Sequence, residues 1–295
     1  MSRNRLTEAL LALLMLLPSL VLFGAFVFYP LGRTFYLGLH QNDFFGGNQV
    51  YVGFKQYTDV ATSEEFRHSL WVTVQFVLMT VPLGLVLGVG LAVLANKAIR
   101  GIGVFRTIFS TTVATSVAVA SLMWLVLFNP SIGVLTRILP FEVLKSPGVL
   151  NNPTWALPAV SLATVWANLG FTFIVVTAGL QSIPEELYES AELDGAGGWR
   201  RFTNVTLPML SPTLLFATVV LTIGAFQAYG QIDFLTEGGP GDSTRVLVYS
   251  IYGKSSPIGG NPGVQAATAI LLFGVLFVLS LVQFTVLERR THYVA

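Results

Sequence analysis

Six long apolar runs, separated by polar or turn-rich stretches, dominate the chain: 9–29, 70–95, 107–128, 155–180, 211–232 and 264–287. None of these runs contains a charged residue. A helix of about 20 residues crosses a hydrocarbon core roughly 30 Å thick, so each run is long enough for one span. Pro82 and several glycines interrupt the second run, but such breaks are tolerated where neighbouring helices cover the freed backbone groups. The pattern predicts an all-α, polytopic membrane protein with six transmembrane helices.

The first run, 9–29, resembles a signal peptide in its position at the start of the chain. The apolar region of a signal peptide is roughly 7–15 residues long and is followed by a small-residue cleavage site. This run is longer and ends in Phe28-Tyr29-Pro30, which is typical of a membrane interface. We therefore interpret it as an uncleaved first transmembrane helix.

The most polar stretch of the chain, 182–210, lies between the fourth and fifth runs and must leave the membrane. Ser182 and Glu185 have the spacing of a capping box, with Pro184 near the first helical position. Gly195 follows Asp194 and is expected to end this helix, because only glycine enters the left-handed region without strain. A second short helix over about 198–205 then completes a bent helix pair at the membrane surface.

Basic residues are denser in the segments that six spans and an internal amino terminus place inside. These segments contain Arg3, Arg5, Lys97, Arg100, Arg106, Arg200, Arg201, Arg289 and Arg290. The outer loops are longer yet contain only Arg33, Lys55, Arg67, Arg137, Lys145, Arg245 and Lys254. The positive-inside rule therefore places both termini and the 182–210 stretch in the cytoplasm.

Composition supports the membrane class and narrows the chemistry. Charged residues make up 11% of the chain, against roughly a quarter in soluble domains. The net charge of +1 gives no support for nucleic-acid binding. The absence of cysteine excludes disulfides and thiolate metal sites, and His40, His68 and His292 are too scattered to suggest a metal centre, so we expect none.

The sequence contains no phosphate-binding loop of the form G-x-x-x-x-G-K-[ST], no G-x-S-x-G nucleophile elbow and no H-E-x-x-H zinc motif. The chain is therefore expected neither to hydrolyse ATP nor to be an enzyme. A stand-alone secondary transporter is an alternative, but it would usually need buried ionisable groups or an inverted repeat, and neither is visible. A membrane-embedded enzyme is a further alternative that would need a convergent nucleophile and base.

Three stretches resemble one family, the permeases of bacterial ATP-binding-cassette importers. Glu189-Ser190-Ala191, Asp194-Gly195-Ala196, Phe202, Val205 and Leu207-Pro208 are similar to the "EAA" loop of that family, with Ser190 where alanine is usual. The preceding residues, 181–188, resemble the version found in carbohydrate-uptake permeases. Two weaker likenesses are Val52-Gly53-Phe54-Lys55-Gln56-Tyr57, similar to a "GL-NY" stretch, and Glu237-Gly238-Gly239-Pro240, similar to a "GGP" loop.

The resemblance implies the type I importer permease fold, in the bacterial inner membrane, as the first of two homologous permease subunits. It further implies two separate ATPase subunits, which bind ATP and Mg²⁺, and an extracytoplasmic substrate-binding protein. The solute implied is a sugar or a glycerol-3-phosphate or glycerophosphodiester type of molecule. The chain then divides into 1–69 (first helix and outer loop), 70–287 (a five-helix core with the 182–210 coupling loop) and 288–295 (cytoplasmic tail).

In this family the first glutamate of the loop contacts a basic residue of the ATPase and the glycine permits the bend. Those roles fall on Glu189 and Gly195. The full set of residues that the resemblance assigns to coupling is Glu185, Glu189, Ala191, Asp194, Gly195, Ala196, Phe202, Leu207 and Pro208.

Polar and aromatic side chains within or beside the apolar runs are candidates for contact with a transported solute. Amides can bond sugar hydroxyls, and aromatic rings can cover the C–H face of a sugar. The candidates are Gln75, Trp124, Trp166, Asn168, Phe226, Gln227, Tyr229, Gln231 and Gln265. Each one alone could instead hold helices together or sit at the interface, so we expect a cavity near Asn168 and 227–231 only as a group.

The topology can be tested with single cysteines, since the chain has none of its own. Cysteines placed at Ser190 and Ser255 should react with an impermeant thiol reagent from opposite sides of the membrane. If both positions react from outside intact cells, the six-span topology is wrong.

Overall fold

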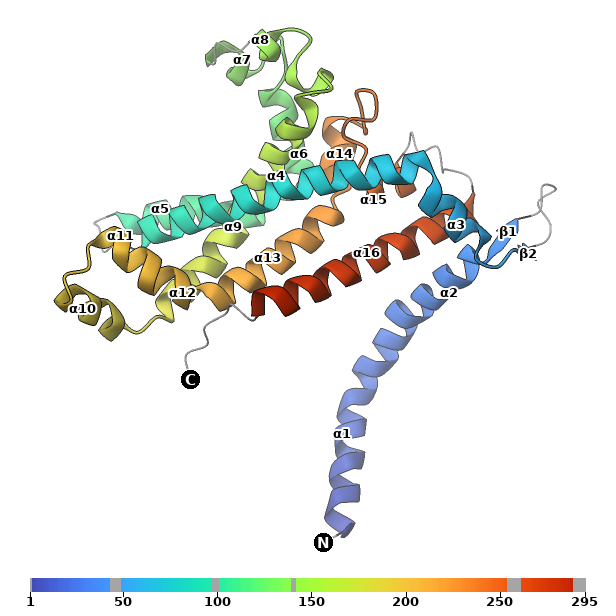
Figure 1. Ribbon diagram of the computed structural model, residues 1–295, viewed down its shortest axis with the longest axis horizontal. Coiled ribbons are helices and arrows are strands. Elements are labelled where there is room, and N and C mark those ends of the chain that lie inside the picture. The colour runs from blue at the N-terminus through green and yellow to red at the C-terminus, as the bar shows by residue number, and fades with distance from the viewer. Residues whose placement is uncertain (1, 43–48, 97–100, 139–141, 254–260, 289–295) are drawn as a thin grey trace. The chain divides into compact units, whose positions relative to one another are not determined.

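The computed structural model describes residues 2–42, 49–96, 101–138, 142–253 and 261–288, and nearly all of its regular structure is helical (Figure 1). The chain forms two compact units. One contains Met1–Ser63 and Ile258–Phe273, and the other contains Glu64–Pro257 and Gly274–Ala295. The long helix α16 (Pro262–Glu288) contributes residues to both.

The first unit begins with one continuous helix, made of α1 (Ser2–Phe23), the π-helical turn η1 (Gly24–Phe28) and α2 (Tyr29–Gly38). The prediction that this helix ends at Tyr29 is wrong. A proline usually breaks a helix because its ring meets the carbonyl group four residues earlier. The wider turn before Pro30, in which the Tyr29 N–H donates to the Gly24 carbonyl, relieves that clash and lets the helix continue.

A short hairpin and helix follow the long helix. Strand β1 (His40–Asn42) pairs antiparallel with β2 (Gln49–Tyr51), and α3 (Lys55–Thr62) comes next. The Gln56 amide donates to the carbonyls of Gly38 (3.2 Å) and His40 (3.0 Å), and the Tyr57 hydroxyl donates to the Phe35 carbonyl (3.1 Å). Both side chains are buried, and burial raises the pKa of the Tyr57 phenol. These bonds fix the carboxyl end of α2.

Two long helices, α4 (Glu64–Ala95) and α9 (Ala156–Gln181), form the centre of the second unit, and α13 (Ser211–Phe226) packs on both. Phe76, Val160 and Val176 are fully buried between them. At Gly88 the two backbones approach closely, because a Cβ added there would overlap the methyl group of Thr172. Small residues at such crossings are typical of helices that pack within a membrane.

The third apolar run does not form the single straight span predicted over 107–128. It is broken into α5 (Ile102–Ser110), the 3₁₀ turn η2 (Thr111–Ala114) and α6 (Val117–Leu127), with a bend of 107° between the two halves. Ser116 accepts a hydrogen bond from the Val119 N–H and so starts the new helix. Thr112 accepts a hydrogen bond from the Gly170 N–H of α9, which holds the turn in place (2.8 Å).

The fifth run also differs from its prediction. The helix α13 ends at Phe226 instead of Ile232, and a separate helix α14 (Gly230–Leu235) follows. At the other end of α13, the preceding segment Gly198–Met209 meets α13 at a bend of 66°. By length and composition, the described residues contain four helices that could cross a membrane, or six if each bent pair counts as one span. The six apolar runs are therefore all helical, but two of them are broken.

The "GGP" stretch, Glu237-Gly238-Gly239-Pro240, forms a tight turn. Glu237 and Gly238 have φ of 50° and 83°, and the Gly239 N–H donates to the Thr236 carbonyl (2.9 Å). Arg245 forms an ion pair with Asp242 (2.7 Å) just beyond this turn. The helix α15 (Leu247–Tyr252) begins where the Leu247 N–H donates to the Thr73 hydroxyl of α4.

The remaining connection, between α6 and α9, contains α7 (Val134–Ile138), α8 (Glu142–Lys145) and the 3₁₀ turn η3 (Val149–Asn151). Some sequence predictions lie outside the described residues. They concern Ser255, Lys254, Lys97, Arg100, Arg289, Arg290, His292 and the tail beyond Glu288.

The close approach at Gly88 predicts a difference between two glycines of the same helix. Gly88→Ala should lower the free energy of unfolding by about 1–3 kcal/mol, because the added methyl group overpacks the contact with α9. Gly90→Ala is the matched control, since a Cβ at Gly90 meets no atom within 4 Å. Thermal unfolding of the two variants in detergent would measure this, and equal stabilities would contradict the close packing of α4 on α9.

Candidate functional site

The polar 182–210 stretch folds into two short helical arms joined by a turn, shown in yellow to orange at α10, α11 and α12 in Figure 1. The first arm is α10 (Glu185–Leu193). The capping box predicted for Ser182 and Glu185 is wrong, because α10 starts directly after Pro184, which has no side-chain acceptor. The Ser182 hydroxyl instead donates to the Gly179 carbonyl and ends α9 (2.8 Å).

The turn after α10 has the hydrogen bonds of a Schellman motif. The Ala196 N–H donates to the Ala191 carbonyl (2.9 Å), and the Gly195 N–H donates to the Glu192 carbonyl (3.0 Å). Gly195 has a φ of +75°, so its predicted left-handed conformation is confirmed. A Cβ at Gly195 would meet no atom within 4 Å, so the requirement for glycine comes from the backbone dihedral and not from space.

The second arm runs through α11 (Gly198–Arg201), the π-helical turn η4 (Phe202–Thr206) and α12 (Leu207–Met209), with Pro208 in the first turn of α12. The second helix predicted over 198–205 is thus present and extends further. We refer to residues 185–209, which comprise both arms and the turn between them, as the bent arm.

Two side-chain pairs hold the halves of the bent arm together, and sequence reasoning missed both. The Tyr188 and Thr206 hydroxyl groups share a hydrogen bond (3.1 Å), and the Arg201 guanidinium donates to the Glu192 carboxylate (3.0 Å). The residues of each pair lie 18 and 9 positions apart, so only the angle of the turn brings them together. These contacts favour one angle between the two arms.

Several acidic and large apolar side chains of the bent arm are exposed. Leu193 is 90% exposed and Trp199 is 77% exposed, and α10 contains no buried residue. Among the residues that the structure describes, Glu189 makes no ion pair. Such a surface has the composition of a protein-docking face.

The predicted coupling residues divide by exposure. Glu185, Glu189, Asp194, Gly195 and Leu207 are exposed, whereas Ala191, Ala196, Phe202 and Pro208 are partly buried. The exposed members are available to a partner, while the partly buried ones shape the bent arm. Their role in coupling stays a prediction.

Several of the candidate solute contacts come together where α6, α9 and α14 pack on one another. The rings of Trp124 and Trp166 lie edge to face, with centroids 6.2 Å apart. Tyr229, at the start of α14, stacks on Tyr249 (5.6 Å), and Gln231 lies half-buried on the same helix. This group combines aromatic rings with an amide, as the sequence analysis expects for a sugar-like solute.

The other candidates lie in different surroundings. Gln75 and Asn168 are half-buried on α4 and α9, Gln227 is exposed at the end of α13, and Phe226 is buried at 2% exposure. Gln265, on α16, belongs to the other unit. Their role in the solute path stays a prediction.

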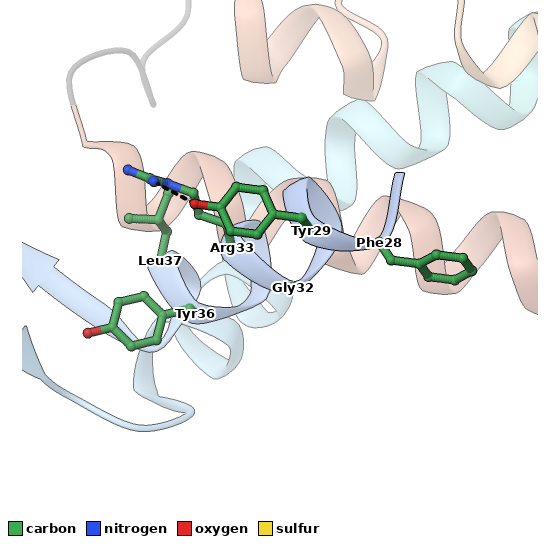
Figure 2. A pocket seen from close by; sticks show the side chains of 6 residues that line it. All are labelled: Phe28, Tyr29, Gly32, Arg33, Tyr36 and Leu37. Atoms are coloured by element: carbon green, nitrogen blue, oxygen red, sulfur yellow. Dashed lines mark hydrogen bonds between the residues drawn. The ribbon is translucent and has the colours of Figure 1, made fainter. Parts of the chain in front are cut away.

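A hollow of about 540 Å³ on the first unit contains none of the predicted site residues. Figure 2 shows that it is lined by side chains from successive turns of one helix, from Phe28 to Leu37, with the Arg33 guanidinium donating to the Tyr29 hydroxyl (3.3 Å). A hollow lined by one helix is an open surface and not an enclosed site.

Comparisons with known proteins agree with this fold. Residues 81–293 match the family model described as "Binding-protein-dependent transport system inner membrane component". The "sn-glycerol-3-phosphate transport system permease protein UgpA" of Agrobacterium fabrum is 35% identical over 289 residues, covering 96% of this chain and 97% of the relative. The "Trehalose/maltose transport system permease protein MalF" of Thermococcus litoralis is 34% identical over 284 residues, covering 95% of each.

Among solved structures, a bacterial ABC transporter involved in the import of the acidic polysaccharide alginate contains a chain that superposes with a TM-score of 0.80. The sequence identity is 24%, and the match covers 98% of this chain and 99% of that one. At this identity the likeness shows the fold alone, which is that of an ABC importer permease.

The family model covers the bent arm and most of the second unit, and the relatives span almost the whole chain. The resemblance seen in the sequence is thereby confirmed. This chain belongs to the binding-protein-dependent transport system inner membrane component family, and within it the chain is similar to carbohydrate-type permeases of ABC importers.

Proposed function

We propose that this chain is a transmembrane permease subunit of an ATP-binding-cassette importer, and that its bent arm couples it to separate ATPase subunits. The observation that carries the proposal is the bent arm itself, whose two halves are joined by side-chain contacts, while Glu189 makes no ion pair among the described residues and Leu193 is 90% exposed. Both termini and the bent arm then lie in the cytoplasm. ATP and Mg²⁺ would be bound by the ATPase subunits, and this chain would carry neither a cofactor nor a catalytic site.

The geometry allows the bent arm to pass on a rigid-body movement. The Tyr188–Thr206 and Glu192–Arg201 contacts join the two arms, so we expect them to move together. A push on α10 would therefore reach the end of α9 through Ile183 and the start of α13 through α12. Since α9 packs on α4, α6 and α14, such a displacement would reach the helices that carry Trp124, Trp166 and Tyr229.

The solute class follows from the chemistry of the candidate path and from the relatives. Trp124 and Trp166 provide aromatic surface, and the half-buried Asn168 and Gln231 provide amides, which suits a small polyhydroxylated molecule. The two relatives described above are named for sn-glycerol-3-phosphate and for trehalose and maltose. We infer a sugar or a glycerol-3-phosphate type of solute, exposed alternately to the two sides of the membrane.

Two further partners complete the proposal. A second, homologous permease subunit would form the other half of the path. An extracytoplasmic binding protein would deliver the solute, in keeping with the alginate transporter, which has been crystallised in complex with an alginate pentasaccharide-bound periplasmic protein. That transporter superposes on this chain with a TM-score of 0.80 at 24% identity.

Charge reversal at Glu189 tests the docking. If Glu189 meets a basic residue of an ATPase, Glu189→Arg should weaken the assembly by on the order of 1–3 kcal/mol and lower solute-stimulated ATP hydrolysis accordingly. A matching charge reversal on the ATPase should partly restore it. Asp59→Arg on α3 is a control, since Asp59 is an exposed acid far along the chain from the bent arm. Wild-type transport by Glu189→Arg would count against the docking.

Substitution of Gly195 tests whether the bend itself matters. Gly195→Val should place about 1–3 kcal/mol of strain on a residue whose φ is +75°, and the arm can relieve it by straightening. We expect a subunit that inserts normally, in an assembly whose ATPase subunits hydrolyse ATP slowly or without solute uptake, as measured in reconstituted vesicles at equal subunit content.

Two further substitutions serve as controls, because they separate the effect of the backbone dihedral of Gly195 from that of an added side chain. Gly197→Val should transport normally, because Gly197 has a φ of −63° and open space around it. Gly195→Asn should retain more activity than Gly195→Val, because asparagine tolerates the left-handed region. Unchanged transport by Gly195→Val would mean that the bend is not needed for coupling.

A further inference from the structure

A second hollow, of about 810 Å³, lies within the second unit between the bent arm and the long helices α4 and α13. Its longest wall is one stripe of α4 from Leu85 to Leu94, with Gly90 in the middle of that stripe. Trp199 and Phe202 of the bent arm form another wall, and their rings are 5.7 Å apart. Almost all of the side chains around the hollow are apolar.

The dimensions of the hollow fit half of a bilayer. The nine residue steps from Leu85 to Leu94 correspond to about 13 Å along a helix, and one leaflet contributes about 15 Å to a hydrocarbon core roughly 30 Å thick. Val86 and Leu94 are 69% and 55% exposed, so the chain itself does not fill the space beside this wall. Trp199 lines the hollow from the bent arm, which the sequence predicts to lie outside the membrane, and tryptophan is typical of the membrane interface.

Two arginines, Arg106 and Arg200, lie next to residues that line the hollow. Arg106 donates two hydrogen bonds to the Ala95 carbonyl at the end of α4 (2.9 and 3.1 Å), which places its guanidinium one residue beyond Leu94. Two of its five donors are used there, so others are available. Arg200, next to Trp199, is exposed and makes no ion pair among the described residues, whereas Arg201 is held by Glu192.

The geometry points to a binding site for an anionic phospholipid, with one acyl chain in the hollow and the phosphate between Arg200 and Arg106. An apolar channel one leaflet long, with cations at its interfacial end, matches both parts of such a lipid. A neutral lipid would satisfy the apolar walls alone. Because α4 and the bent arm are opposite walls of the hollow, the bound acyl chain would pack between them and seat the arm against the membrane.

Native mass spectrometry of the purified full-length chain, titrated with phosphatidylglycerol or with phosphatidylcholine of the same acyl chains, tests this site. The wild-type chain should retain one phosphatidylglycerol more tightly than one phosphatidylcholine. Gly90→Leu should weaken both by about tenfold, because its side chain enters the open space at Gly90 and displaces the acyl chain. Gly274→Leu, at another helical glycine with open space around it, should bind like the wild type.

Substitution of Arg200 tests the contact with the lipid headgroup separately from the contact with the acyl chain. Arg200→Gln should weaken phosphatidylglycerol binding about fivefold and leave phosphatidylcholine binding unchanged, since one basic side chain near the headgroup is lost. Arg200→Lys should restore the preference for phosphatidylglycerol, because lysine also binds phosphate. Thermal unfolding of each variant would verify that the fold is intact.

Two results would overturn the proposal. One is unchanged binding of both lipids by Gly90→Leu. The other is a disulfide between a cysteine at Val86 and a cysteine scanned along the second permease subunit in the assembled transporter, which would mean that a protein helix, and not a lipid, occupies the hollow. The chain has no other cysteine, so such a cross-link would be unambiguous.

Discussion

A break in a helix within hydrocarbon exposes backbone groups that the membrane cannot satisfy, and this constraint governs the second unit. At the break in the third run and at the end of α4, side chains bond to backbone groups. Thr112 accepts the Gly170 N–H where the third run turns, and Ser116 begins the helix beyond the turn. Arg106 satisfies the Ala95 carbonyl at the end of α4. The bends are therefore stable features, and they let α6 and α14 pack beside α9 around the proposed solute path.

The bent arm has to keep its shape outside the membrane with almost no buried core. A Schellman turn at Gly195, a hydroxyl pair at Tyr188 and Thr206 and the Glu192–Arg201 ion pair replace that core. Because the arm follows α9 after the short turn 182–184 and leads into α13, we propose that movement of the arm is transmitted to both helices.

Much of this organisation can be predicted from the sequence, because span length and helix-stop chemistry are local. The six apolar runs are helical, and the left-handed Gly195 follows from the residues around it. The bend near Ser116 could not be predicted, since threonine- and serine-rich stretches also occur in straight spans and its stability depends on a contact with α9. Ser182 was misassigned because the end of α9 competes for the same hydroxyl, and Tyr188 meets Thr206 only after the turn forms.

The central claim is that this chain moves solute only as one subunit of a larger, ATP-driven assembly. Affinity purification of the tagged chain from its native membrane in mild detergent, followed by identification of the bound chains and by uptake assays of the isolated chain and of the assembly, tests it most directly. The account predicts that an ATPase and a second permease co-purify and that only the assembly, supplied with ATP, accumulates solute. A lone chain that transports solute down an ion gradient without ATP would contradict it.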